Sequence, residues 1–109
     1  MSLEHISKNT KIFIGDSIIL AEKALTSLID YDYKQADKHA KAAISSLDVA
    51  IQSKDDLEIF QSVINAIPKI VEEVFNGINF GERNDTVGLY TSIENVSKLF
   101  LECVSDFSV

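Results

Sequence analysis

Apolar residues recur every three or four positions between residues 57 and 78, and polar residues fill the positions opposite them. The apolar set is Leu57, Phe60, Ile64, Ile67, Val71, Val74 and Ile78. This spacing matches the 3.6-residue period of an α-helix, whereas a half-buried strand would alternate every second residue. The segment is therefore predicted to be an amphipathic helix, capped by Asp55 or Asp56, that needs partner helices to cover its apolar side.

Three further segments show a helical pattern of apolar positions. Residues 3–29 follow Ser2 as a plausible N-cap, although residues 11–15 would also suit a short strand. Residues 33–52 follow Asp32, which has the spacing of a capping box with Gln35. The buried stripe expected there is Tyr33, Ala36, Ala40, Ala43, Ile44, Leu47, Ala50 and Ile51. Residues 86–106 form the last predicted helix, expected to bury Leu89, Tyr90, Ile93, Val96, Phe100, Cys103, Val104 and Phe107.

Two local signals interrupt the helical pattern of residues 57–78. Pro68 cannot donate a backbone hydrogen bond and its ring clashes with the carbonyl of Ile64, so it should either kink the helix or divide it. Asn76 and Gly77 resemble a helix C-terminus, because glycine is favoured just past the last turn. Residues 76–85 are the longest polar, glycine-bearing stretch, and we predict a loop there.

Four helices of about 20 residues joined by short links predict one all-α domain over residues 1–109. Short links place successive helices side by side, which favours an antiparallel up-down-up-down four-helix bundle. The composition, 46% hydrophobic and 25% charged, is typical of a globular protein. Cys103 is the single cysteine, and no segment resembles a membrane span or a signal peptide. These features favour a cytoplasmic protein that does not bind membranes, with Cys103 packed in the core.

The charge is unevenly distributed along the chain. The net charge is −7, yet residues 1–54 carry seven acidic and seven basic side chains, and residues 55–109 carry ten and three. An acidic half repels phosphate, so nucleic-acid binding is not expected. The simplest interpretation is solubility, and the alternative is a surface for a basic protein partner.

Two isoleucines fall outside the apolar arc of the first predicted helix. Ile12 and Ile19 are seven positions apart and share a face with Lys23, Thr26 and Asp30. A pair of apolar side chains aligned on the outside of a helix suggests a contact site. The alternatives are that the two isoleucines are simply exposed or that the fold covers them. As a contact site, Ile12, Ile19 and Lys23 are predicted to meet either a partner protein or a second copy of the chain in a homodimer.

The sequence offers little support for catalysis or metal binding. The two histidines, His5 and His39, have no acidic residue three positions before them, so the paired Glu-x-x-His motifs of di-metal bundles are absent. One cysteine and two distant histidines do not make a local zinc motif. No serine has a recognisable base partner in the sequence, and neither does Cys103. We therefore expect neither an enzyme nor a cofactor.

His39 lies at the edge of an apolar stripe with Lys38 and Lys41 beside it, in an acidic chain of four predicted helices. This arrangement resembles the histidine phosphotransfer domains of phosphorelays, which implies His39 as an alternative phosphoacceptor. That family typically places a lysine and a glycine three and four residues after its histidine. Here those positions hold Ala42 and Ala43.

Ala21 and Ala24 share a helical spacing, as do Tyr33, Ala36, Ala40 and Ile44 in the next predicted helix. This pattern resembles the helical hairpins of tetratricopeptide and microtubule-interacting-and-transport domains. The lengths and order of the four helices are similar to those of small export chaperones for flagellar subunits. These resemblances imply a protein-binding role. The leading expectation is a non-enzymatic interaction module of the chaperone, adaptor, immunity or inhibitor type, which would use an apolar helix face or groove.

Overall fold

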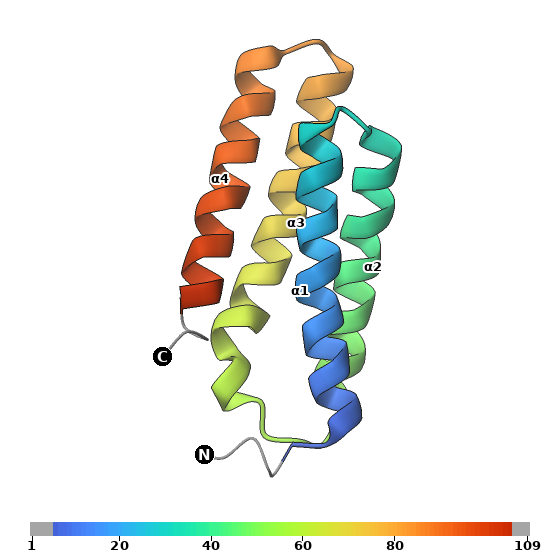
Figure 1. Cartoon of the computed structure of the whole chain (residues 1–109), viewed down its shortest axis with the longest axis vertical. Coiled ribbons are helices and arrows are strands. Elements are labelled where there is room, and N and C mark those ends of the chain that lie inside the picture. The colour runs from blue at the N-terminus through green and yellow to red at the C-terminus, as the bar shows by residue number, and fades with distance from the viewer. Residues whose placement is uncertain (1–5, 106–109) are drawn as a thin grey trace.

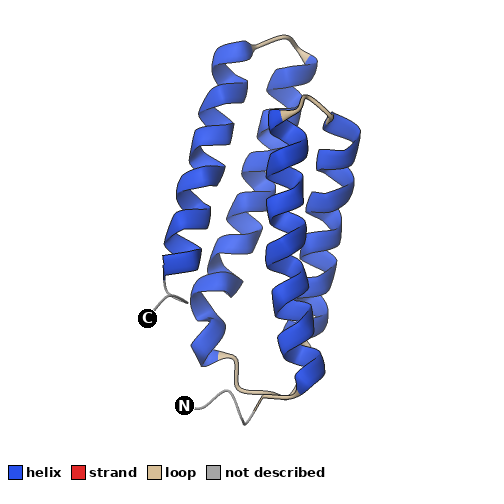
Figure 2. Ribbon diagram, viewed as in Figure 1, coloured by secondary structure: helices blue, strands red, loops and turns tan. Residues whose placement is uncertain are grey.

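The computed structural model describes residues 6–105, and side chains only as far as Cys103. The regular structure of this range is entirely helical (Figures 1 and 2). The elements are α1 (Lys8–Ile29), α2 (Tyr33–Ile51), the short 3₁₀-helix η2 (Glu58–Phe60), α3 (Gln61–Glu82) and α4 (Thr86–Ser105). The predicted four-helix fold is confirmed, and the alternative of a strand at residues 11–15 is wrong.

The four helices form a flattened bundle whose Cα atoms extend over 47 × 25 × 16 Å. The α1–α2 and α3–α4 loops lie at one end and the α2–α3 connection at the other, so successive helices run in opposite directions (Figure 1). α3 packs against each of the other three helices, α4 packs mainly on α3, and α2 and α4 do not contact each other within the described range. The α1–α4 side is therefore the least closed side of the bundle.

The predicted apolar stripes meet in one core. Its buried members include Ile14, Ala21, Ala24, Leu28, Ala36, Ala40, Ala43, Leu47, Val63, Ile67, Ile70, Val74, Val96 and Cys103. Two residues predicted to be buried are about half exposed, Ile51 at 45% and Tyr90 at 50%. Ile51 is the last residue of α2, and the hydroxyl of Tyr90 meets that of Tyr31 at the bundle end. Of the other residues expected to be buried, Val104 and Phe107 lie outside the described side chains.

The first helix begins later than predicted. Ser7, in an extended conformation, is the N-cap of α1, and its hydroxyl accepts a hydrogen bond from the backbone N–H of Thr10. Asp55 in turn accepts hydrogen bonds from the hydroxyls of Ser7 and Thr10, which fixes the helix start at this point. Asp55 therefore binds the start of α1 and does not cap the third helix. The N-cap predicted at Ser2 lies outside the described residues.

Of the next elements, α2 has a side-chain cap, whereas η2 and α3 begin after Leu57 and Phe60 without a side-chain cap hydrogen bond. Asp32 accepts a 3.2 Å hydrogen bond from the backbone N–H of Gln35, so the predicted cap of α2 is confirmed. Asp56 accepts a 2.9 Å bond from the backbone N–H of Glu58 at the start of η2. The helix predicted from residue 57 thus begins as a 3₁₀ turn and becomes α3 at Gln61.

The loop predicted at residues 76–85 is mostly helix, because α3 continues to Glu82. Gly77 is buried, and a Cβ there would lie 2.8 Å from Cδ2 of Leu28. A Cβ at Gly81 would overlap the ring of Tyr33. The absence of side chains at these positions lets helices approach one another and does not end the helix. Pro68 lies inside α3, so it does not divide the segment into two helices.

Candidate functional site

The two isoleucines singled out by the sequence lie on the outer side of α1. Ile12 is 47% exposed and Ile19 is 52% exposed, and Lys23 is exposed on the same helix. Seven residues of α-helix span about 10 Å, so the two isoleucines stand one above the other along the helix. We call this surface, made of Ile12, Ile19 and Lys23, the α1 outer face. Its role in binding is still a prediction.

A shallow hollow beside the α1 outer face brings two separate sequence candidates together. It has a volume of about 290 Å³ and is lined by Ile19, Glu22, Lys23, Thr26, Ser27 and His39. His39 reaches this hollow from α2, where its side chain is partly buried against α1. The sequence placed Lys23 and His39 in different helices, and the close α1–α2 packing makes them neighbours.

The charges around the hollow are mixed. Lys41, which the sequence placed beside His39, forms a 2.9 Å ion pair with Asp37 along α2. Within the described part of the chain, Lys23 and Lys38 form no ion pair, so they remain the available cations near His39. Glu22 adds a carboxylate to the lining of the hollow. The site therefore combines one apolar wall with charges of both signs.

Within residues 6–103, the His39 ring forms no hydrogen bond with another protein group. No group of three His, Cys, Asp or Glu side chains in the described part of the chain could hold a metal ion. Over the same range, no helix has the length and apolar character needed to cross a membrane.

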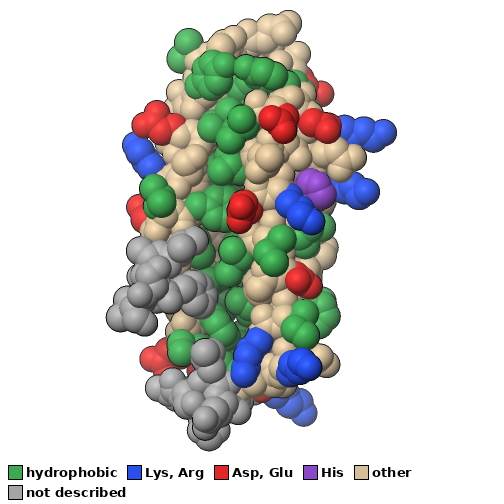
Figure 3. All heavy atoms as spheres, viewed as in Figure 1, with side chains coloured by type: hydrophobic (Ala, Val, Ile, Leu, Met, Phe, Trp, Pro, Cys, Tyr) green, Lys and Arg blue, Asp and Glu red, His purple; other side chains and the backbone are tan. Residues whose placement is uncertain are grey.

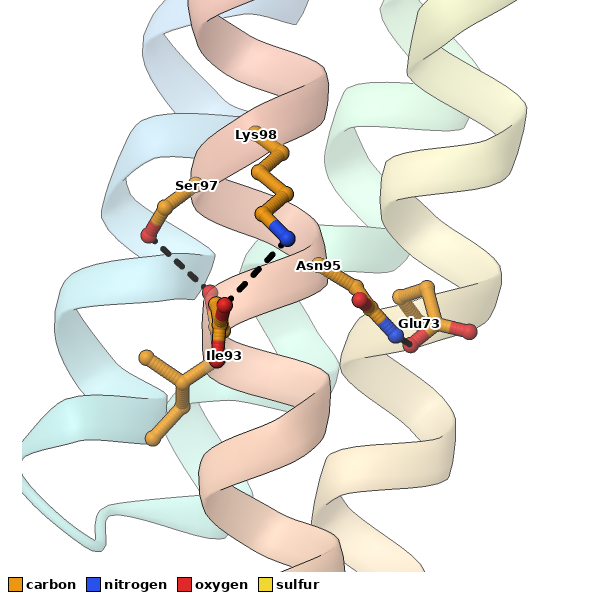
Figure 4. Close-up of polar contacts among 6 residues, drawn as sticks. Glu73, Ile93, Asn95, Ser97 and Lys98 are labelled. Atoms are coloured by element: carbon orange, nitrogen blue, oxygen red, sulfur yellow. Dashed lines mark hydrogen bonds and ion pairs between the residues drawn. The ribbon is translucent and has the colours of Figure 1, made fainter.

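A second hollow lies between α3 and α4 and has a volume of about 390 Å³. Asn95 of α4 donates a 3.2 Å hydrogen bond to Glu73 of α3 beside it, and Lys98 pairs with Glu94 along α4 (Figure 4). Its lining contains two lysines and two glutamates: Lys69, Glu72, Glu73, Asn95, Lys98 and Leu99. These opposite charges largely compensate each other, so the acidic half of the sequence does not create a strongly acidic groove here.

The open side of the bundle is apolar. Figure 3 shows hydrophobic side chains gathered along the junction of α1 and α4, with α3 behind it. In Figure 4, Ile93 and Ser97 lie on the α1 side of α4, away from the Asn95–Glu73 contact. The hydroxyl of Ser97 donates to the carbonyl of Ile93, so its hydrogen-bonding capacity is satisfied within α4.

The sequence reasoning missed a group of tyrosines at the end where the α1–α2 and α3–α4 loops lie. Tyr31 and Tyr33 line a hollow of about 240 Å³ there, and the hydroxyls of Tyr31 and Tyr90 are 2.8 Å apart. The sequence signal for this group is the Asp30-Tyr31-Asp32-Tyr33 turn, which by itself predicts only a helix boundary. Its relation to Tyr90, 59 positions away from Tyr31, required the fold.

Neither a protein-family model, nor a curated protein sequence, nor a solved structure is significantly similar to this chain.

Proposed function

We propose that this protein is a non-enzymatic interaction module of the cytoplasm that binds a protein partner through the α1 outer face. The observation that supports this is the exposure of Ile12 and Ile19, at 47% and 52%, on one side of α1. Apolar side chains about 10 Å apart match successive turns of an amphipathic partner helix. Covering the exposed half of each isoleucine would contribute roughly 1 kcal/mol per residue.

The charges on the same side of α1 favour a foreign partner over a symmetric pair of α1 helices. Two copies packed antiparallel with Ile12 against Ile19 would place Lys8 of one copy opposite Lys23 of the other. Both lysines are exposed, and like charges directly opposite each other destabilise a contact. A chaperone, adaptor, immunity or inhibitor protein that captures another chain is therefore preferred here to a homodimer.

The test compares the double variant Ile12→Asp, Ile19→Asp with the control Ile59→Asp, whose isoleucine is 45% exposed in η2, outside the α1 outer face. Each protein is used as bait, retained proteins are identified by mass spectrometry, and the interaction is repeated with the purified candidate. A partner held by the wild type and Ile59→Asp but lost by the double variant supports the proposal.

Two results would contradict the proposal. The first is a partner that binds the double variant as tightly as the wild type, which would locate the contact elsewhere. The second is a large loss of thermal stability in the double variant alone, which would make the isoleucines part of the packing. Light scattering at two salt concentrations distinguishes a homodimer, which would show twice the monomer mass without any partner.

A second candidate function rests on the position of His39 in the open hollow beside Lys23. Here His39 would accept a phosphoryl group, and Lys23 would offset part of its negative charge. Incubation with a labelled phosphodonor should then give a phosphoryl group that is lost in acid and is absent from His39→Gln. Label retained by His39→Gln, or no label on the wild type, would reject this alternative.

A further inference from the structure

All tyrosines of the chain lie at one end of the bundle. The sequence contains three tyrosines and no tryptophan. Tyr31 is in the α1–α2 loop, Tyr33 begins α2, and Tyr90 is near the start of α4. The hydroxyls of Tyr31 and Tyr90 are 2.8 Å apart, which joins the two loops of this end. We call this surface, formed by residues 29–33 and 82–90, the tyrosine end.

A hollow of about 240 Å³ opens between the two loops of the tyrosine end. Its lining residues are Tyr31, Tyr33, Gly81, Asn84, Asp85, Thr86 and Leu89. The ring of Tyr33 fits there because Gly81 has no side chain that would occupy its space. The hollow thus combines two aromatic rings with the carboxylate of Asp85 and the side chain of Leu89.

The tyrosine end is acidic. Residues 29–33 and 82–90 contain four carboxylates, Asp30, Asp32, Glu82 and Asp85, all of them exposed, and one arginine. The guanidinium of Arg83 lies over the ring of Phe80, 5.4 Å from its centre, and its Nε donates to the carbonyl of Asn79. Arg83 is therefore held against its own helix, and the negative charge of the loops is not locally neutralised by a salt bridge in the described structure.

Apolar surface adjoins these charges. Ile29 is 49% exposed, Tyr90 is 50% exposed and Val87 is 78% exposed. Val87 and Tyr90 are three residues apart on α4 and so lie on neighbouring parts of one helix face. Figure 3 shows hydrophobic side chains at the end of the molecule where the loops lie. Tyrosine is enriched among the energetically important residues of protein interfaces.

We propose that the tyrosine end binds a basic segment of a partner protein, with an arginine or lysine side chain of that segment entering the hollow beside Tyr31 and Asp85. Tyrosine rings attract cations through their faces, and carboxylates pair with them. The apolar neighbours of the basic side chain would rest on Val87 and Tyr90. This site is separate from the α1 outer face, so either proposal can fail without the other.

The tyrosines themselves provide the measurement. Because the chain has no tryptophan and its three tyrosines are all at this end, intrinsic tyrosine fluorescence of the full chain reports on this surface alone. The probe is a short synthetic peptide that alternates arginine and leucine, and the comparison peptide alternates glutamate and leucine. We expect a saturable fluorescence change with the arginine peptide, weakened by added salt, and none with the glutamate peptide.

The decisive variant is Asp32→Asn, Asp85→Asn. Asp32 accepts a hydrogen bond from the backbone N–H of Gln35, and Asp85 accepts one from the backbone N–H of Gly88, so both carboxylates cap helices. Asparagine caps a helix about as well as aspartate. The variant therefore keeps the fold while removing two charges, and we expect it to bind the arginine peptide about tenfold more weakly. The variant Asp16→Asn, Asp48→Asn removes the same charge from exposed positions on α1 and α2 and should bind like the wild type.

Four results would overturn the proposal. The first two are no saturable response to the arginine peptide and an equal response to the glutamate peptide. The third is equal weakening by the two double variants, which would mean that the peptide senses only the net charge of the protein. The fourth is a fluorescence change on dilution without peptide, which would assign the tyrosine end to self-association instead.

Discussion

The hydroxyl of Thr10 donates a 2.7 Å hydrogen bond to the carboxylate of Asp55, 45 residues later in the chain. The same carboxylate oxygen, Oδ2, accepts from the hydroxyl and the backbone N–H of Ser7, at 2.9 and 3.1 Å. The first turn of α1 is thereby joined to the segment that connects α2 to η2. Since Thr10 is buried, this contact closes the end of the core opposite the tyrosines.

The Asp55 contact predicts a dependence of stability on pH. The hydrogen bonds from Thr10, and then those from Ser7, hold the pKa of Asp55 below its usual value of 3.8. The ionised form therefore stabilises the fold at neutral pH, and this contribution disappears as the pH falls from about 3.8 through the lower folded-state pKa. Asp55→Asn should destabilise the protein at neutral pH and by less in acid. Urea unfolding at both pH values measures this, and a difference that is independent of pH would contradict it.

Two glycines in helices should respond in opposite directions to alanine. A Cβ at Gly15 would meet no atom within 4 Å, so Gly15→Ala should raise the free energy of unfolding by about 0.5–1 kcal/mol. A Cβ at Gly77 would press on the fully buried Leu28, so Gly77→Ala should lower it by about 1–3 kcal/mol. Urea unfolding of the two variants provides the comparison. Equal changes in the free energy of unfolding would show that helix propensity, and not packing, determines the effect of alanine at both positions.

Pro68 lies in the interior of α3 and is exposed, so it leaves the carbonyl of Ile64 without its usual backbone donor. Pro68→Ala restores this donor without disturbing the core. We expect the free energy of unfolding to rise, by up to about 3 kcal/mol. The neighbouring exposed position offers a control, because Lys69→Ala should change stability by less than about 0.5 kcal/mol. Thermal unfolding would refute the prediction if Pro68→Ala were less stable than the wild type.

The Tyr31–Tyr90 contact should be visible in an alkaline titration. The hydrogen bond with Tyr90 is the main reason why the pKa of Tyr31 is raised above its usual value of 10.0. The contact therefore stabilises the fold below pH 10.0, and its contribution is lost as the pH rises through the folded-state pKa. In Tyr90→Phe the pKa of Tyr31 should fall toward the usual value. Phenolate absorbance measures this, and Tyr33→Phe, which keeps the pair intact, serves as the control.

The sequence by itself determined the helical architecture. The apolar spacing of α3 and the alanine stripe of α2 require helices that pack on each other, and their buried residues confirm it. Local signals also placed the N-cap at Asp32 and the exposure of Ile12 and Ile19 correctly. Each of these features depends only on a residue and its neighbours within a few helical turns. The apolar period of a single helix is therefore enough to predict them.

The tertiary structure decided the roles of residues whose chemistry allows more than one. Gly77 suits a helix end as well as a close helix contact, and only the position of Leu28 selects the contact. Asp55 could cap the following helix, yet the hydroxyls of Ser7 and Thr10 offer it more hydrogen bonds. The tyrosine end and the meeting of Lys23 with His39 likewise join residues from different helices. Helical periodicity says which side of a helix is apolar, but the neighbour that each residue meets depends on how the helices pack together.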